Sequence, residues 1–325
     1  MGVKLQNKNL ITVDLGGTKI LSALINGQDQ IIDRFKESTK ITGEIEPIIE
    51  GINNSINKLL ENNSLTQKDI KAICLGVPGT VNPNTGLIGY APNLGIRDYN
   101  IKETLSKYYN IPILIENDVN LAGLGIQQAE LKENVKNMLV VFIGTGIGAA
   151  LFIDGKIYRG SSFYAGEIGH MRINPKGKPS KKSKLTFENI ASRTAVVNAI
   201  VDEIKKGKKS YLSDIVKKGK RIKSKSLRAA VEVEDKLVIE YLSRSARVIG
   251  SVLGSIATLL NLDSIMLGGG VIEALNDFML PKIRKAFNTA VLPEPGKIVK
   301  IDYTRLGDDA PLFGGIKLAQ EFLES

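Results

Sequence analysis

The hydrophobic positions of this chain fall into short apolar runs and longer helical repeats, and glycines separate several of the runs. Residues 10–26 form an apolar run, a Gly-Gly turn and a second apolar run, which predicts a strand, a turn and a strand. The same pattern recurs at 138–153, around the glycines of 144–148. Apolar residues three and four positions apart predict amphipathic helices over 45–62, 187–205 and 234–260.

The segments between these elements are shorter. The pair Asp154-Gly155 predicts a hairpin turn. Residues 80–100 are rich in Pro, Asn and Gly, which predicts an ordered loop with at most a small hairpin. The remaining patterns predict strands at 30–37, 71–77, 111–116 and 263–267, helices at 101–109 and 120–130, and a closing helix that runs to about residue 322.

Two halves that each open with a strand, a glycine turn and a strand predict two similar α/β domains. The length of 325 residues also favours two domains over a single core. We place the N-terminal α/β domain at 1–118, completed by the closing helix at 311–325, and the C-terminal α/β domain at 119–310. Asp308, Asp309 and Pro311 suit the start of that closing helix.

Composition and charge exclude several classes of protein. The most apolar stretch, 138–153, is interrupted by glycines and is too short for a membrane span, and we expect no secretory leader. A single cysteine, Cys74, in a predicted buried strand excludes an internal disulfide framework and fits a reducing, cytoplasmic compartment. The formal charge of +10 raises the question of nucleic acid. The lysine-rich stretches almost lack the aromatic residues that stack on bases, so we interpret them as solvated surface at 176–184, 205–209 and 217–228.

The glycine turns are candidate phosphate sites. A polyphosphate needs backbone N–H groups that it can approach closely, and glycine gives that access because it has no Cβ. Either strand–glycine–strand turn alone fits an ordinary tight hairpin equally well, and neither has the P-loop spacing. A third glycine run directly after a predicted strand favours a nucleotide. The candidate residues are Gly16, Gly17, Thr18, Lys19, Thr145, Gly146, Gly269 and Gly270, with Asp14 suited to a hydrated Mg²⁺ ion.

A carboxylate and several polar groups are candidates for work on an acceptor. Asp118 follows a predicted strand, where open α/β sheets bind their ligands, and it could take the proton of an attacking hydroxyl. The alternative is that Asp118 only caps the helix that begins near Asn120. A neutral polyol must be held by planar hydrogen-bonding groups, and the candidates are Asn93, Asn117, Glu167, His170 and Glu188. No Ser or Cys nucleophile motif accompanies His170, the only histidine, which excludes a catalytic triad.

Taken in order, these motifs resemble those of the ROK family, which contains bacterial glucokinases, N-acetylmannosamine kinases, some fructokinases and sugar-responsive repressors. The resemblance covers nearly the whole chain. It rests on D14-L-G-G-T-K19, G76-V-P-G79, A91-P-N-L94, E116-N-D118 followed by N120-L-A-G123, F142-I-G-T-G-I-G148 and L267-G-G-G270.

The resemblance implies the two-domain, actin-like ATPase fold, with ATP and a sugar in an interdomain cleft. It implies that Asp118 is the general base and that the protein is a homodimer. The implied reaction is ATP- and Mg²⁺-dependent phosphorylation of a hexose hydroxyl, as in a glucokinase at the 6-OH. The implied sugar contacts are Gly79, Asn93, Asn117, Glu167, His170 and Glu188.

One segment departs from the family pattern. Most members follow Gly-His with a cysteine-rich segment that binds zinc, whereas 171–187 here contains no cysteine. We therefore expect no zinc site, and the acceptor could instead be N-acetylmannosamine, N-acetylglucosamine, fructose or a β-glucoside. A repressor is disfavoured because only thirteen residues precede Asp14. A sugar-binding protein without catalysis is disfavoured because Asp14, Asp118 and both phosphate turns are intact.

Overall fold

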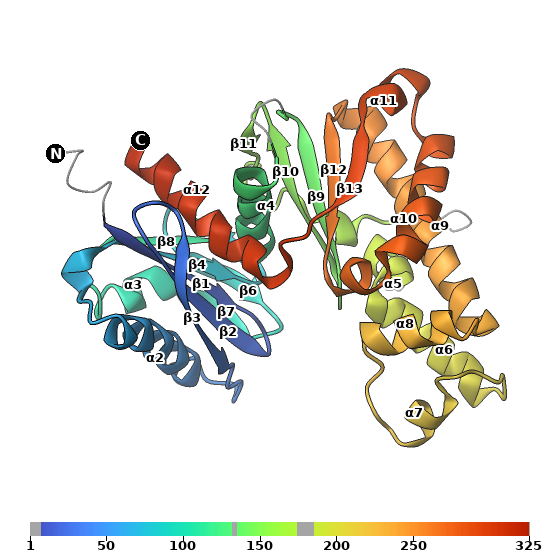
Figure 1. Cartoon of the computed structure of the whole chain (residues 1–325), viewed down its shortest axis with the longest axis horizontal. Coiled ribbons are helices and arrows are strands. Elements are labelled where there is room, and N and C mark those ends of the chain that lie inside the picture. The colour runs from blue at the N-terminus through green and yellow to red at the C-terminus, as the bar shows by residue number, and fades with distance from the viewer. Residues whose placement is uncertain (1–7, 132–134, 174–184, 325) are drawn as a thin grey trace. The chain divides into compact units, whose positions relative to one another are not determined.

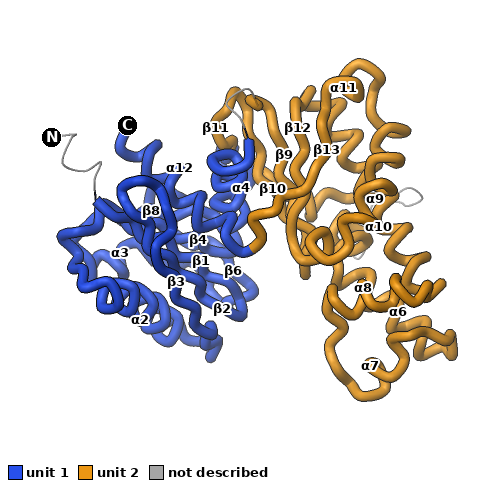
Figure 2. The backbone as a smooth tube through the Cα atoms, viewed as in Figure 1, with its two compact units in different colours: residues 1–132, 159–165, 308–325 blue, residues 133–158, 166–307 orange. Residues whose placement is uncertain are grey.

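The computed structural model describes residues 8–131, 135–173 and 185–324. The chain forms two compact units, shown in Figure 2. Unit 1 contains residues 1–132, 159–165 and 308–325, and unit 2 contains residues 133–158 and 166–307. This division differs from the one we placed after residue 118, because helix α4 (Asp118–Ala129) packs on the C-terminal helix α12 (Ala310–Glu324) and so groups with unit 1.

The main sheet of unit 1 has five strands in the order β3-β2-β1-β4-β8. Strand β2 pairs antiparallel with β1 on one side and with β3 on the other, and β4 and β8 run parallel to β1. Helix α2 lies against β1, β2 and β3, whereas α12 contacts β1 and β4 (Figure 1). The bounds are β1 Asn9–Leu15, β2 Lys19–Ile25, β3 Ile31–Ser38, α2 Glu46–Asn62, β4 Ile70–Val77 and β8 Ile113–Asn117.

The sequence explains this sheet. Strands β1, β2 and β4 are apolar on both faces because helices cover both faces. The apolar stripe of α2, including Ile48, Ile52 and Ile56, joins Val13 and Leu15 in the core of unit 1. The strands and the helix predicted here are confirmed.

A second, three-stranded antiparallel sheet completes unit 1. Residues 80–100 were expected to form a loop with at most a hairpin, and that expectation is wrong. The inward residues Ile88 and Ile96 belong to the core of unit 1, but the turn-forming Pro, Asn and Gly around them hide this pattern. The elements are β5 Thr80–Asn82, β6 Leu87–Ala91 and β7 Ile96–Asn100, followed by α3 Ile101–Leu105.

The sheet of unit 2 repeats the arrangement of unit 1. Its order is β11-β10-β9-β12-β13. Strand β10 pairs antiparallel with β9 and with β11, and β12 and β13 run parallel to β9. The predicted hairpin turn at Asp154-Gly155 is confirmed, since both residues have positive φ angles of 51° and 76°. The bounds are β9 Met138–Ile143, β10 Ile147–Ile153, β11 Lys156–Ile157, β12 Ser264–Gly268 and β13 Lys300–Tyr303.

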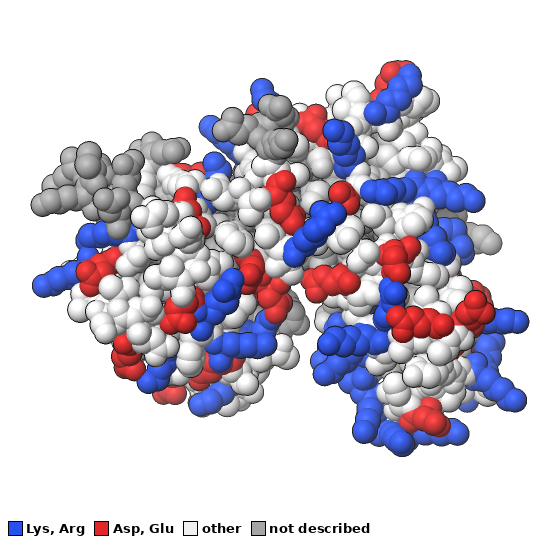
Figure 3. Space-filling view, viewed as in Figure 1, with Lys and Arg blue, Asp and Glu red and all other residues white. Residues whose placement is uncertain are grey.

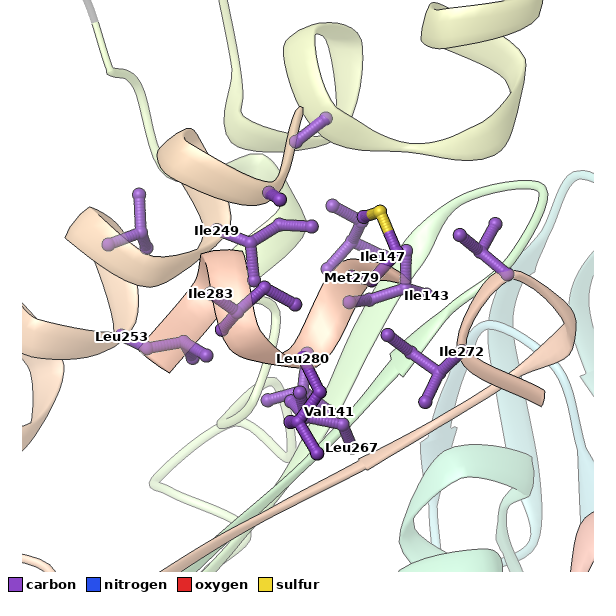
Figure 4. Packing of buried hydrophobic residues seen from close by; sticks show 14 of the residues in the cluster. Val141, Ile143, Ile147, Ile249, Leu253, Leu267, Ile272, Met279, Leu280 and Ile283 are labelled. Atoms are coloured by element: carbon purple, nitrogen blue, oxygen red, sulfur yellow. The ribbon is translucent and has the colours of Figure 1, made fainter. Parts of the chain in front are cut away.

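Helices of unit 2 pack on this sheet around a large apolar core. Figure 4 shows residues of β9, β10 and β12 meeting Ile249 and Leu253 of α9 and Met279 and Ile283 of α10. Helix α9 was predicted, but α10 and strand β13 were not. The bounds are α5 Phe187–Ala191, α6 Arg193–Lys205, α7 Ser213–Lys217, α8 Ser224–Glu232, α9 Lys236–Leu260, α10 Gly270–Ala290 and α11 Pro293–Ile298.

The single helix predicted over 187–205 is wrong. Ser192 interrupts it with an extended conformation, φ −69° and ψ 164°, and separates α5 from α6. Its hydroxyl accepts a hydrogen bond from the Ala195 N–H, so Ser192 is the N-cap of α6. The helical spacing of apolar residues continues across this break, and the pattern alone therefore does not reveal it.

Glycines allow the two helices α4 and α12 to touch. A Cβ on Gly314 would overlap the Leu121 carbonyl oxygen, and a Cβ on Gly125 would overlap the Ala310 carbonyl oxygen. Because α4 begins at Asp118, this close contact positions that residue relative to the rest of unit 1. No helix among the described residues combines the length and the apolar character that a membrane span needs.

Candidate functional site

The first glycine turn joins β1 to β2 in unit 1. The Gly16 N–H bonds to the Lys19 carbonyl at 2.9 Å, and the Thr39 hydroxyl donates to the Gly16 carbonyl at 2.6 Å. A Cβ on Gly17 would lie 3.5 Å from Asn93. The structure therefore brings the first predicted phosphate turn and one predicted sugar contact together.

Three aspartates gather at this end of the sheet. Asp14 pairs with Gly76 of β4, and a Cβ on Gly76 would lie 3.5 Å from the Asp118 Cα. Burial, followed by the negative charges of Asp118 and Asp308, raises the pKa of Asp14 to about 7, against the opposing effect of Lys19. The Lys19 ammonium donates a hydrogen bond to the Asp308 carboxylate.

The structure decides which residue caps α4. Asn117 is the N-cap, because its Oδ1 accepts from the Asn120 N–H at 3.0 Å, and Asp118 is the first helical residue. The capping role considered for Asp118 is therefore wrong. The Asn117 amide group donates to the Gly79 carbonyl at 2.9 Å and to Asp118 Oδ1 at 3.1 Å, and the Val119 N–H donates to the same Oδ1 at 2.9 Å. One asparagine thus connects two loops and orients the carboxylate.

A buried ion pair between Glu116 and Arg159 supports the segment that contains Asn117 and Asp118. Glu116, whose side chain is 2% exposed, accepts from the Asn117 N–H and from Asn120 Nδ2, both at 3.0 Å, through Oε1. Its Oε2 accepts from Arg159 at 2.7 Å. Sequence reasoning did not find Arg159, since an isolated arginine 43 positions away carries no motif.

Unit 1 also contains a pocket beside Gly79. A Cβ on Gly79 would overlap the Tyr90 carbonyl oxygen, so the loop and β6 lie in close contact. The pocket has a volume of about 290 Å³ and mixes polar and aromatic residues. It is lined by Thr80, Val81, Asn82, Leu87, Gly89, Ser162, Phe163 and Tyr164.

The second glycine turn joins β9 to β10 in unit 2. The Gly144 N–H bonds to the Gly146 carbonyl at 2.9 Å. Glu188 Oε2 accepts from the Ile147 N–H at 2.9 Å, and it would overlap a Cβ on Gly146. Glu188, predicted as a sugar contact, therefore lies directly against the second phosphate turn.

The third glycine turn lies beside the second. Gly268 pairs with Phe142 at the end of β9, and Gly269 has a φ of +85°. A Cβ on Gly269 would lie 2.8 Å from the backbone of Ile143. Only glycine fits this crossing, which places the start of α10 against Ile143, the last residue before the second glycine turn.

The other predicted sugar contacts of unit 2 form a small group near Glu188. His170 Nε2 lies 3.6 Å from a Glu167 carboxylate oxygen. Burial raises the pKa of Glu167, His170 lowers it and Glu188 raises it. Among the described residues, no three His, Cys, Asp or Glu side chains form a metal-binding group. Most of the cysteine-free segment lies at 174–184, outside the described residues, so the expected absence of zinc stays a prediction.

Two α/β units with the same strand order, each with a glycine turn between its first two strands, define the class of actin-like ATPase folds. The chain belongs to the ROK family, whose family model matches residues 10–322. The chain is 30% identical over 307 residues to a glucokinase of Halalkalibacterium halodurans, covering 94% of this chain and 93% of that protein. It is 25% identical over 311 residues to a xylose repressor of Caldicellulosiruptor bescii, covering 95% of this chain and 77% of the repressor.

One solved structure with the same fold contains a sugar and an ATP analogue. It is a ROK family glucokinase from Streptomyces griseus in complex with glucose and AMPPNP. Its TM-score to this chain is 0.80 at 25% identity, and the match covers 96% of this chain and 99% of that one. The predicted family and fold class are thereby confirmed.

Proposed function

We propose that this protein is an ATP-dependent sugar kinase that phosphorylates a hexose hydroxyl, as a glucokinase does at the 6-OH. The observation that carries the proposal is the placement of Asp118 at the end of β8, beside Asp14 and in the same unit as the first glycine turn. The glucokinase relative that spans almost the same length supports it.

In this proposal Asp118 is the general base. Removing the proton from the attacking hydroxyl contributes about 10²–10⁴ in rate, provided that the carboxylate is held in place. The hydrogen bonds from Asn117 and Val119 hold it, and the ion pair of Glu116 with Arg159 holds Asn117 in turn. Asn117 already donates two hydrogen bonds, so we assign it an orienting role in addition to the proposed sugar contact.

The residues present fit ATP and Mg²⁺. The turns at Gly16-Gly17, Thr145-Gly146 and Gly269-Gly270 are the proposed phosphate and nucleotide contacts, together with Thr18 and Lys19. Asp14 would hold a hydrated Mg²⁺, and burial together with the neighbouring negative charges raises its pKa, which a bound cation would oppose. The ion, when bound, supplies neutralisation of the phosphate charge.

Each unit contains a group of the proposed sugar contacts. Gly79, Asn93 and Asn117 belong to unit 1, and Glu167, His170 and Glu188 belong to unit 2. A homodimer and a cytoplasmic location complete the proposal. The second candidate function is a sugar-responsive regulator, which the similarity to a xylose repressor favours.

A sugar panel separates these functions. Release of ADP is measured from ATP and Mg²⁺ with glucose, N-acetylmannosamine, N-acetylglucosamine, fructose and a β-glucoside, with a sugar-free reaction as control. We expect sugar-dependent turnover with at least one hexose, and glucose as the best acceptor. Binding of a sugar without any turnover on the whole panel would favour the regulator.

A further inference from the structure

Arg193 is the first residue of α6 and lies against the second glycine turn of unit 2. Its Nη2 donates a hydrogen bond of 2.7 Å to Thr145 Oγ1, and its backbone N–H bonds to the Gly144 carbonyl at 3.0 Å. The next residue, Thr194, donates its hydroxyl to the Thr145 carbonyl at 2.7 Å. The start of α6 therefore holds this turn through three hydrogen bonds.

The same guanidinium also reaches the third glycine turn. Arg193 Nη1 lies 3.5 Å from Ser224 Oγ and 3.9 Å from the position that a Cβ on Gly270 would take. Gly270 is the first residue of α10, a helix of 21 residues. One side chain thus lies beside both glycine turns of unit 2.

Among the described residues, no carboxylate forms an ion pair with the Arg193 guanidinium, whereas Arg159 and Arg228 each meet a carboxylate. Burial and the positive charge of Arg221 both lower the pKa of Arg193. A cation at the first position of a helix also opposes the dipole of that helix. The site is therefore electrostatically unfavourable until an anion enters it.

Part of a basic stretch contributes to this positive potential. Residues 217–228, interpreted from the sequence as solvated surface, include Arg221, which acts on Arg193, and Ser224, which contacts it. Lys and Arg side chains are prominent over α6, α7 and α8 in Figure 3. The start of α10 adds the positive end of a second helix dipole.

We propose that Arg193 binds the polyphosphate of the nucleotide directly, between Thr145 and the start of α10. The inference rests on the proposed ATP-dependent function. Because Thr145 Oγ1 accepts its hydrogen bond from Arg193, its own O–H stays available as a donor to the same phosphate. The resemblance to the ROK family implies that the turn at Gly269-Gly270 lies on the adenosine side. On that basis Arg193 contacts the phosphates nearer the adenosine, which ADP retains.

Calorimetric titration with ATP, ADP and adenosine tests this contact in the full chain. Arg193→Ala is expected to weaken ADP and ATP binding by roughly 10- to 100-fold, as for a lost hydrogen bond to a charged group, and to leave adenosine binding within about twofold. Arg193→Lys should recover part of the loss. The matched control is Lys205→Ala, which removes the same charge about 18 Å further along α6.

A purely structural role for Arg193 has a different signature. Removing an uncompensated charge should leave the melting temperature of the nucleotide-free protein unchanged or raise it. The inference is overturned if Arg193→Ala binds ADP like the wild type. It is equally overturned if the variant loses adenosine and ADP binding equally and melts at a lower temperature, because Arg193 then only supports the turn.

The two proposals fail in distinguishable ways. If the wild-type protein binds ADP, the titrations decide the role of Arg193 even when no sugar of the panel is phosphorylated, and only the proposed kinase function then fails. If the wild-type protein binds no adenine nucleotide, both proposals are wrong.

Discussion

The two glycine turns occupy the same position in two sheets of the same topology, yet the charged groups around them differ: aspartates gather at the first turn, whereas Arg193 and Glu188 lie against the second. The turn of unit 1 has Asp14, Asp118 and Asp308 near it, with Lys19 as the partner of one of them. The turn of unit 2 has Arg193, which forms no ion pair with any described residue. In unit 1 the hairpin itself supplies Asp14 and Lys19, and the other charges at the two turns come from elements added around the hairpins.

Those added elements differ in origin. In unit 1 they are the start of α4 and the segment before α12, and in unit 2 they are the starts of α6 and α10. This difference fits the proposed phosphoryl transfer. In the proposal, the aspartates of unit 1 bind Mg²⁺ and accept the proton, and Arg193 of unit 2 binds the phosphates. The following changes test that division, beginning with the largest expected effect.

Asp118→Asn removes the proposed base at the start of α4 and keeps the shape of the side chain. We expect turnover on the best sugar to fall by about 10²–10⁴, with little change in nucleotide affinity, because the proton acceptor is lost and the nucleotide contacts remain. Steady-state rates and ADP titration measure the two effects. Asp202→Asn, on the surface of α6, is the control, and a rate equal to the wild type would exclude Asp118 as the base.

Asp14→Asn should stabilise the protein in the absence of nucleotide and metal. The folded-state pKa of Asp14 is about 7 against 3.8 unfolded, so the native state holds this proton more tightly. Stability is therefore lost as the pH rises from about 4 to 7, and the loss above pH 7 is up to about 4 kcal/mol, from about three pKa units. Asparagine has no charge to bury and removes this loss.

Urea unfolding at pH 4, 6 and 8 measures that effect. The gain of Asp14→Asn over the wild type should be small at pH 4 and full at pH 8, whereas Asp202→Asn should show no such trend. If the two proteins differed in unfolding free energy by the same amount at all three pH values, the ionised Asp14 carboxylate would not destabilise the native state.

Gly314→Ala should damage unit 1 by separating α4 from α12. The added Cβ would meet the Leu121 carbonyl oxygen, which belongs to a helix backbone and cannot rotate away. Overpacking of this kind costs about 1–3 kcal/mol in the free energy of unfolding. Chemical denaturation measures it, with Lys317→Ala on the same helix as control. A stability within about 0.5 kcal/mol of the wild type would show that the helix contact is adaptable.

The sequence predicts best those features that repeat locally. The strands of the two five-stranded sheets other than β13 and helices α2 and α9 follow from the pattern of apolar residues, because each is fixed by its own residues and by burial of its apolar face. The break at Ser192 could not be found in this way, since the apolar spacing continues across it. The three-stranded sheet at 80–100 was missed because its strands are short and the Pro, Asn and Gly residues between them obscure the alternation of apolar and polar residues.

Partners that are distant in the chain could not be predicted from any pattern. Arg159, Asp308 and Arg193 reach their sites through tertiary contacts, and none belongs to a motif with a characteristic spacing. Even within a recognised motif the division of roles needed the structure. Asn117 and Asp118 are both good N-cap residues, and only the hydrogen bond to the Asn120 N–H distinguishes them.

The pair of Glu116 and Arg159 has a consequence for how the chain can be divided. Residues 159–165 belong to unit 1 although the segments on both sides belong to unit 2, and residues 308–325 return to unit 1 at the end. A fragment that stops at residue 132 would keep the buried Glu116 carboxylate and lose its guanidinium. An unpaired buried charge costs several kcal/mol. Unit 1 is therefore not a contiguous module, and any split or permuted version of this protein has to keep the short segment 159–165 together with it.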